Sequence, residues 1–149
     1  MVLVSNHISY GTMVMVMIDT RIYEAEWAYI PSYSDITAKR NVTYDKYDGA
    51  SCGAVVSNVG GHPDRNLTWK NVYCTKGGKY VISVHCKANQ NTKTELIVNG
   101  KMHTVTIVDD STPTVSYLVT LKKGNNEITF GNSAEAIPMV DYMALEMVK

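Results

Sequence analysis

The chain has no net charge and no long apolar run. Its 14 lysines and arginines balance its 14 aspartates and glutamates, so the formal charge at pH 7 is zero. Nucleic acids and anionic membranes attract proteins with a basic footprint, so the composition argues against both as partners. No segment approaches the ~20 apolar residues of a membrane span. A length of 149 residues fits one domain with a substantial core.

Recognisable catalytic and zinc-binding motifs are also missing. The chain contains no Gly-x-Ser-x-Gly, no His-Glu-x-x-His and no phosphate-binding glycine loop. Cys52, Cys74 and Cys86 match no zinc spacing. Cys74 could pair with either of the others in an oxidising compartment, but three reduced and partly buried thiols are the preferred interpretation. Residues 1–4 are too short for a signal peptide and lack its charged flank.

Short apolar and β-branched segments follow one another, separated by turn residues. Asn99-Gly100 is the strongest of the hairpin signals. No segment keeps the 3.6-residue period of a long helix. The pattern therefore predicts an all-β fold, an antiparallel β-sandwich or barrel. The predicted strands are residues 12–18, 22–27, 53–58, 67–73, 79–87, 94–98, 101–108, 115–121, 126–130 and 139–148.

Three carboxylates lie on predicted strands near the two ends of the chain. Glu24 and Glu26 are two residues apart and would share one face of a strand. Asp141 falls in a row with Met139, Met143, Leu145 and Met147 that otherwise looks like a core face. Carboxylates on such a surface are costly unless something positive meets them. Oxygen ligands without a nearby cysteine or histidine suit a hard cation, and calcium is the natural candidate.

Two other interpretations of Glu24 and Glu26 stay open. They could face solvent while Tyr23, Ala25 and Trp27 face inward. Together with Asp141 they also allow a glycosidase interpretation, since paired carboxylates carry out glycoside hydrolysis, although all three belong to strands and not to loops around a cleft. We expect both tryptophans, at positions 27 and 69, in the core because both lie in predicted strands. By its place in the strand alternation, the histidine at position 85 is expected at the solvated surface.

Seven weak motifs follow in order between residues 22 and 148. They are Tyr23-Glu24-Ala25-Glu26, a small-residue segment at 49–56, a strand at 67–72, a glycine-then-tyrosine strand at 77–84, Leu96-Ile97-Val98-Asn99-Gly100, a hairpin at 119–128 and Pro138-Met139-Val140-Asp141-Tyr142-Met143. Together they resemble the calcium-dependent carbohydrate-binding modules of families 6 and 35. This resemblance implies a jelly-roll sandwich of the galactose-binding-like type for residues 21–149.

The resemblance also implies ligand sites. Glu24, Glu26 and Asp141 occupy the positions of structural calcium ligands, and carbonyls of the loop at 31–48 would complete the shell. The ion would stabilise the fold and would carry out no chemistry.

Sugar binding in these families uses loops at one end of the sandwich. Asn132 matches a common contact, since an amide can donate to one hydroxyl and accept from another. Asn58, His62 and Tyr47 are the other candidate carbohydrate contacts. The usual aromatic platform is absent, because Ala54 replaces a tyrosine and residues 109–115 contain no aromatic. An aromatic of the long loop region would replace it, from Tyr29, Tyr33, Tyr44 or Tyr47, or this copy binds sugar weakly or not at all.

Residues 1–20 are expected to be a leading strand, either a remnant of a preceding β-domain or an extra edge strand of the same sandwich. Asn6-His7 and the strand at 11–18 resemble the end of the C-terminal domain of family 27 glycoside hydrolases, the α-galactosidase group. We therefore expect a secreted or periplasmic, non-catalytic module that binds an oligosaccharide or polysaccharide and targets a linked glycoside hydrolase. The alternatives are a module that only braces an α-galactosidase-like enzyme, and a glycosidase domain itself. The edge strand at 12–18 could pair with a second copy to form a homodimer.

Overall fold

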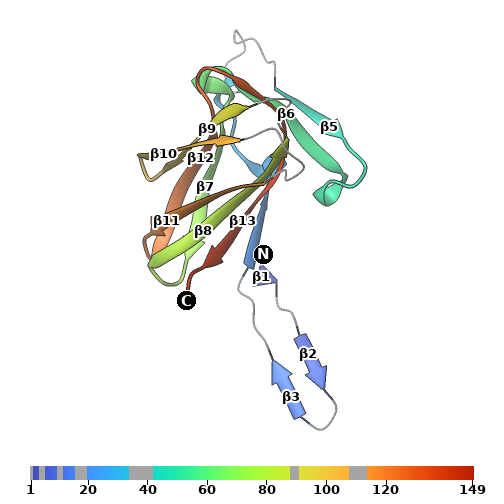
Figure 1. Cartoon of the computed structure of the whole chain (residues 1–149), viewed down its shortest axis with the longest axis vertical. Helices are drawn as coiled ribbons and strands as arrows, with labels where there is room; N and C mark the ends of the chain where they lie inside the picture. The colour runs from blue at the N-terminus through green and yellow to red at the C-terminus, as the bar shows by residue number, and fades with distance from the viewer. Residues whose placement is uncertain are drawn as a thin grey trace.

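Two antiparallel sheets pack face to face across an apolar core (Figure 1). The structure is a computed structural model that describes residues 2–3, 6–9, 12–15, 20–33, 42–87, 91–107 and 114–149. One sheet contains β1 (Val2–Leu3), β4 (Thr20–Glu24), β5 (Thr43–Lys46), β6 (Ala54–Gly60), β8 (Gly78–Lys87), β11 (Thr114–Leu121) and β13 (Ala136–Met147). The other has the order β10 (Lys101–Ile107), β9 (Thr92–Val98), β12 (Gly124–Gly131), β7 (Leu67–Cys74).

Strand β13 is the centre of the larger sheet. It pairs with β8 along one side, from Met139 to Met147. On its other side it pairs first with β6, up to Val140, and then with β4, from Tyr142 onward. Asp141 therefore lies where one neighbouring strand replaces the other, and the register with β8 also shifts between residues 140 and 142. The chain places a carboxylate at the irregular point of its central strand.

The alternation of apolar residues correctly predicts the sandwich. On β8, Tyr80, Ile82, Val84 and Cys86 all point into the core. The Asn99-Gly100 turn joins β9 to β10, and both of its residues have positive φ, as a type I′ turn requires. None of the three cysteines takes part in a disulfide bond. The all-β prediction is confirmed, and the topology is that of a jelly roll.

The predicted strand at 22–27 is only half right. Strand β4 ends at Glu24, and Ala25–Trp27 form a short 3-10 turn, η1, closed by the Ala28 amide donating to the Ala25 carbonyl. The side-chain alternation is lost at this turn, so Trp27 is 63% exposed and is no core residue. Trp69, on β7, is 4% exposed, as predicted.

The predicted core row on the last strand is also interrupted. Met143 and Leu145 are buried as expected, but Val140 replaces Met139 in the core. The cause is the β-bulge at Asp141, which inserts one extra residue and reverses the facing of the residues before it. Asp141 consequently does not share a face with the buried methionine.

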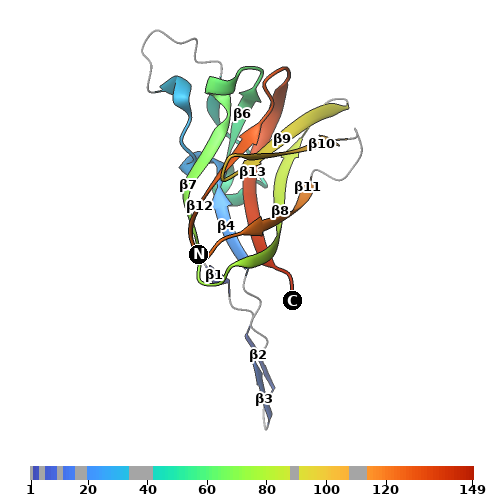
Figure 2. The same ribbon diagram turned by 90° about the vertical axis from the view of Figure 1, so that its left-hand side faces the viewer.

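The leading segment forms its own hairpin. β2 (Asn6–Ser9) and β3 (Thr12–Met15) pair with each other and, among the described residues, with no other strand. Figures 1 and 2 show this hairpin projecting beyond the sandwich. Residues 16–18 of the predicted edge strand lie outside the described residues, and the predicted domain boundary stays a prediction. None of the described segments forms a helix with the length and hydrophobicity needed to cross a membrane.

Candidate functional site

The three predicted carboxylates come from three different local structures. Glu24 ends β4 and is 4% exposed, Glu26 lies inside η1, and Asp141 forms the bulge of β13. The pairing of Tyr142 with Glu24 brings the two terminal strands side by side. The close approach of β4 and β13 was predicted, although the bulge and the turn that aim the carboxylates were not.

A fourth segment reaches this cluster. The backbone amide of Ser51, in the short turn η3 (Ser51–Gly53), donates to Asp141 Oδ1 and Oδ2 at 3.0 and 3.1 Å. The Ser51 hydroxyl donates to Glu24 Oε1, and the Cys52 thiol lies 3.4 Å from the same oxygen. Turn η3 thus supplies hydrogen-bond donors to two of the three carboxylates.

Two other oxygens of the cluster have no such partner. Among the described residues, Glu24 Oε2 and Glu26 Oε2 are buried without a hydrogen bond. Burial raises the pKa of Glu26, and the negative charges of Glu24 and Asp141 raise it further. Burial also raises the pKa of Asp141, again with a contribution from Glu24. Three acidic groups therefore lie close enough to repel one another, and such a group is costly without a cation.

The donor set fits calcium, but the described residues supply only part of a shell. Carboxylate oxygens are the ligands that this ion prefers, and it takes six to eight of them. Across the described residues, no three histidine, cysteine, aspartate or glutamate side chains are already arranged as a metal site. The unpartnered oxygens and the mutual repulsion show that the three carboxylates lie close together, without the geometry of a complete metal site. Residues 34–41, which belong to the loop expected to supply carbonyls, lie outside the described part of the chain.

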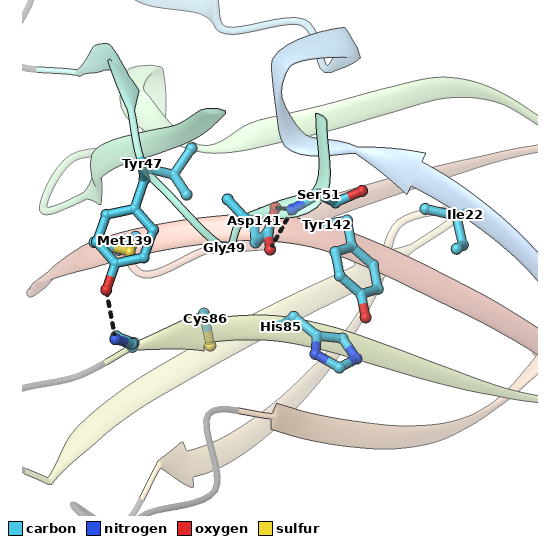
Figure 3. A pocket seen from close by; sticks show the side chains of 12 residues that line it. Ile22, Tyr47, Gly49, Ser51, His85, Cys86, Met139, Asp141 and Tyr142 are labelled. Atoms are coloured by element: carbon cyan, nitrogen blue, oxygen red, sulfur yellow. Dashed lines mark hydrogen bonds between the residues drawn. The ribbon is translucent and has the colours of Figure 1, made fainter. Parts of the chain in front are cut away.

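A pocket of about 550 Å³ adjoins Asp141 on the outer face of the larger sheet (Figure 3). Its walls come from β4, β6, β8, β13, η3 and the segment between β5 and η3. The lining residues are Ile22, Tyr47, Gly49, Ala50, Ser51, Val55, His85, Cys86, Lys87, Met139, Asp141 and Tyr142.

Aromatic rings lie at two places in this pocket. His85 and Tyr142 stack on adjacent strands, with ring centroids 4.1 Å apart and planes 20° apart. Tyr47 lies toward the other end, where its hydroxyl accepts a hydrogen bond from Lys87 at 2.9 Å. In Figure 3, Met139 lies beside Tyr47 and away from the stacked pair. The pocket thus offers flat apolar surfaces together with an amine and a carboxylate.

His85 is where the sequence interpretation falls short. It faces outward, as predicted, but it is only partly exposed and is stacked in the pocket. Burial lowers the pKa of its imidazole, while the negative charge of Asp141 opposes that change. The one signal available in the sequence was a histidine at an outward-facing position of a predicted strand. Its partner Tyr142 could not be identified without the cross-strand register that the bulge creates.

The structure places Asn132 in a structural role. It is 1% exposed, and its Nδ2 donates to the Lys93 carbonyl. Its Oδ1 accepts from the amides of Ala134 and Glu135, at 2.8 and 3.3 Å. Both ends of the amide are therefore engaged inside the loop before β13. The predicted sugar contact stays a prediction, and a ligand would have to displace these bonds.

The other candidate contacts separate into two places. Asn58 and Gly60 line a small pocket with Arg65 and Ala136, beside the loop that contains Asn132. His62 caps the short turn η4 (Pro63–Arg65), where its Nδ1 lies 2.6 Å from Asp64 Oδ1. Tyr47 lines the other pocket with Asp141. The candidates thus form no single site.

Compared by sequence, the chain matches no protein-family model and no curated protein. By structure, it is similar to a family 35 carbohydrate-binding module from Clostridium thermocellum. The TM-score is 0.71 and the identity 23%, over 85% of this chain and 98% of that one.

Parts of larger enzymes also have this fold. An exo-β-1,3-galactanase from Phanerochaete chrysosporium, solved with galactose, gives a TM-score of 0.69 at 21% identity, over 89% of this chain and 30% of the enzyme. A GH26-CBM35 β-(1,4)-mannanase from Podospora anserina gives 0.68 at 20% identity, over 87% of this chain and 28% of that one. At such low identities, these similarities show a shared jelly-roll fold.

Proposed function

We propose that this chain is a non-catalytic carbohydrate-binding module with a structural calcium ion. The observation that carries the proposal is the pocket between Tyr47 and the stacked His85–Tyr142 pair. Sugars are amphipathic: their ring faces pack on aromatic surfaces, and their hydroxyls need donors and acceptors. The Lys87 amine and the Asp141 carboxylate supply these polar groups. Two aromatic surfaces here would replace the platform that the sequence lacks at its usual positions.

The module would act by adsorption. By holding a glycan near a linked glycoside hydrolase, it would raise the local concentration of substrate. Export from the cell follows as part of the same proposal, because polysaccharide substrates lie outside it. The galactanase and mannanase similarities support a linked hydrolase in general. An α-galactosidase-like parent stays a proposal that rests on the resemblance of residues 6–18 alone.

Calcium would bind at Glu24, Glu26 and Asp141. Their unpartnered buried oxygens support this assignment, since a divalent cation would satisfy them and cancel the repulsion. When bound, the ion would neutralise the carboxylates of β4, η1 and the bulge of β13 and so link these three elements. These residues would hold the terminal strands together, and no step of sugar binding needs the ion itself.

Calorimetric titration tests the sugar site. The ligands are β-1,3-galactotriose, which was solved with a galactanase that has this fold over 30% of its chain, manno-oligosaccharides, and arabinose- and xylose-containing oligosaccharides. Tyr47→Ala and Tyr142→Ala should each weaken binding about tenfold or more, whereas exposed Tyr73→Ala, outside the pocket, should not. Equal affinities for all four proteins would place the sugar elsewhere.

Thermal melting tests the ion. Calcium should raise the melting temperature of the EDTA-treated protein, and Glu26→Gln should reduce that rise. Glu146→Gln, an exposed carboxylate on the same strand as Asp141, is the matched control. A melting temperature that EDTA and calcium leave unchanged would remove calcium from the proposal and leave the sugar pocket standing.

A bracing module is the second candidate function. The observation that favours it is the internal engagement of the Asn132 amide, which leaves the predicted loop contact occupied. A folded protein without hits on a glycan array would support it. Release of product from chromogenic galactosides by the isolated chain would instead support a glycosidase domain. The proposed homodimer through residues 12–18 is checked by light scattering.

A further inference from the structure

A second pocket, of about 270 Å³, lies between η1 and the outer edge of β7. Trp27, Tyr29, Thr68, Lys70 and Asn71 are among the residues that line it. In the described residues, β7 pairs with β12 as its one neighbouring strand, and an isolated β-bridge joins Thr68 of β7 to Tyr29. One wall of this pocket is therefore the segment that follows Glu26, and the other wall is β7.

The two tryptophans at this pocket have opposite environments. Trp69 is 4% exposed, and its indole Nε1 donates to the Glu24 carbonyl at 2.9 Å. Trp27 is 63% exposed, although tryptophan is among the residues with most apolar surface to bury. The fold thus buries one indole as a structural anchor and leaves the other at the rim of a cavity.

The neighbouring groups are polar and fixed. Tyr29 is held by two backbone hydrogen bonds with Thr68, at 2.7 and 2.9 Å. The Lys70 amine lies 3.8 Å from the centre of the Tyr29 ring. A cation on a ring face keeps the amine in place at the edge of the pocket. Asn71 adds an exposed amide that can both donate and accept.

We propose that this second pocket, called the Trp27 groove below, is a second saccharide-binding site, distinct from the pocket at Tyr47. One pyranose ring stacks on the Trp27 indole, and its hydroxyls bond to the Lys70 amine and the Asn71 amide. The choice of a saccharide as ligand rests on the proposed function, whereas the location of the site rests on the exposed indole and its polar neighbours. An indole face with an amine and an amide at its edge matches the apolar face and polar rim of a sugar.

The groove is also linked to the carboxylate cluster. Glu26 and Trp27 are consecutive residues of η1, and the indole of Trp69 bonds to the backbone of Glu24. An ion held at Glu24 and Glu26 would therefore fix the turn that presents Trp27. Sugar binding in this groove should be stronger with calcium than with EDTA, because ordering the turn beforehand removes an entropic cost of binding.

The experiment uses tryptophan fluorescence, because the chain has only these two tryptophans. Acrylamide quenching is measured for the whole chain with and without β-1,3-galactotriose and manno-oligosaccharides. Trp27→Phe gives the background from Trp69. Affinities of Trp27→Ala, Tyr47→Ala and the control Tyr73→Ala are then compared by calorimetry. Trp27→Ala should fold normally, since its side chain is mostly exposed.

Protection of Trp27 by sugar, with about tenfold weaker binding in Trp27→Ala and unchanged protection in Tyr47→Ala, supports the groove. Sugar binding that leaves quenching of Trp27 unchanged and depends only on Tyr47 overturns the groove and leaves the proposed function intact. Absence of any saccharide binding by the folded wild-type chain overturns both.

Discussion

The backbone amide of Ser51 donates to both carboxylate oxygens of Asp141, across 90 residues of sequence. The hydroxyl of the same serine donates to Glu24. One turn thus connects the end of β4 to the bulge of β13 through two acidic side chains. Each carboxylate oxygen has more than one lone pair, so these bonds leave capacity for a cation.

Ser51→Ala removes the hydroxyl donor of Glu24 and keeps the amide donor of Asp141. In EDTA, we expect the free energy of unfolding to fall by about 1–2 kcal/mol, because the buried Glu24 carboxylate loses its hydroxyl donor and keeps only the weaker Cys52 thiol. In calcium the loss should be smaller, since the ion meets the same charge. Urea unfolding in both buffers measures this.

Ser116→Ala is the control for that substitution. Ser116 is exposed, and its hydroxyl lies 3.1 Å from the Ser83 hydroxyl on the neighbouring strand. Its removal should change stability by no more than about 0.5 kcal/mol in either buffer. A Ser51→Ala protein as stable as wild type in EDTA would contradict a role for this turn at the carboxylates.

The regular part of the fold could be predicted because its signals are local. Alternation on β8 identifies the inward residues, and Asn99-Gly100 fixes a hairpin register. Each of these features is decided by residues adjacent in sequence. The sandwich follows, since several such strands must bury their apolar faces against one another.

The irregular part could not be predicted, and it contains most of the candidate site. The bulge at Asp141 arises where β4 replaces β6 beside β13, a relationship between three distant segments. The end of β4 at Glu24 depends on packing that the strand-like sequence of residues 22–27 does not reveal. The prediction named three carboxylates that the fold brings close together, but it assigned the wrong faces to their neighbours Trp27 and Met139.

The two tryptophans should differ sharply in their contribution to stability. Trp69→Ala removes a buried indole and its bond to Glu24, so we expect a loss of about 3–5 kcal/mol in unfolding free energy. Trp27→Ala should cost no more than about 0.5 kcal/mol, because its side chain is mostly exposed. Urea denaturation of both variants, followed by circular dichroism, compares them. Similar losses would mean that Trp27 packs into the core.

Asn132→Ala should lower the unfolding free energy, because the Asn132 amide is bonded inside the protein. The substitution leaves the amides of Ala134 and Glu135 without their acceptor and the Lys93 carbonyl without its donor. Buried polar groups left in this way cost about 1–3 kcal/mol each, and we expect about 2 kcal/mol in total because water can reach the exposed loop residues.

Asn58→Gly is the matched comparison, since Asn58 is exposed and has a φ of 59°, which glycine adopts without strain. Its unfolding free energy should stay close to that of wild type. Melting curves and sugar titrations of both variants are measured together. Unchanged stability in Asn132→Ala, with lost sugar binding, would restore Asn132 as a direct contact.

The stability of the protein at alkaline pH tests whether the Tyr117 phenol is buried in the core. Burial raises the pKa of its phenol to about 12, from an ordinary value of about 10. As pH rises through this interval, the unfolded chain loses the proton first, so folding stability is present below pH ~10 and is lost toward pH ~12. Burial also raises the pKa of the Cys86 thiol to about 12, so this group adds to the same loss.

Tyr117→Phe removes the titrating phenol and its hydrogen bond to Thr94. At pH 8 the variant should be about 1 kcal/mol less stable than wild type, because one buried hydrogen bond is gone. Between pH 10 and 11.5 its melting temperature should fall less steeply, with Tyr73→Phe, an exposed position, as the control. Parallel curves for all three proteins would show that Tyr117 ionises as readily in the folded chain as in the unfolded one.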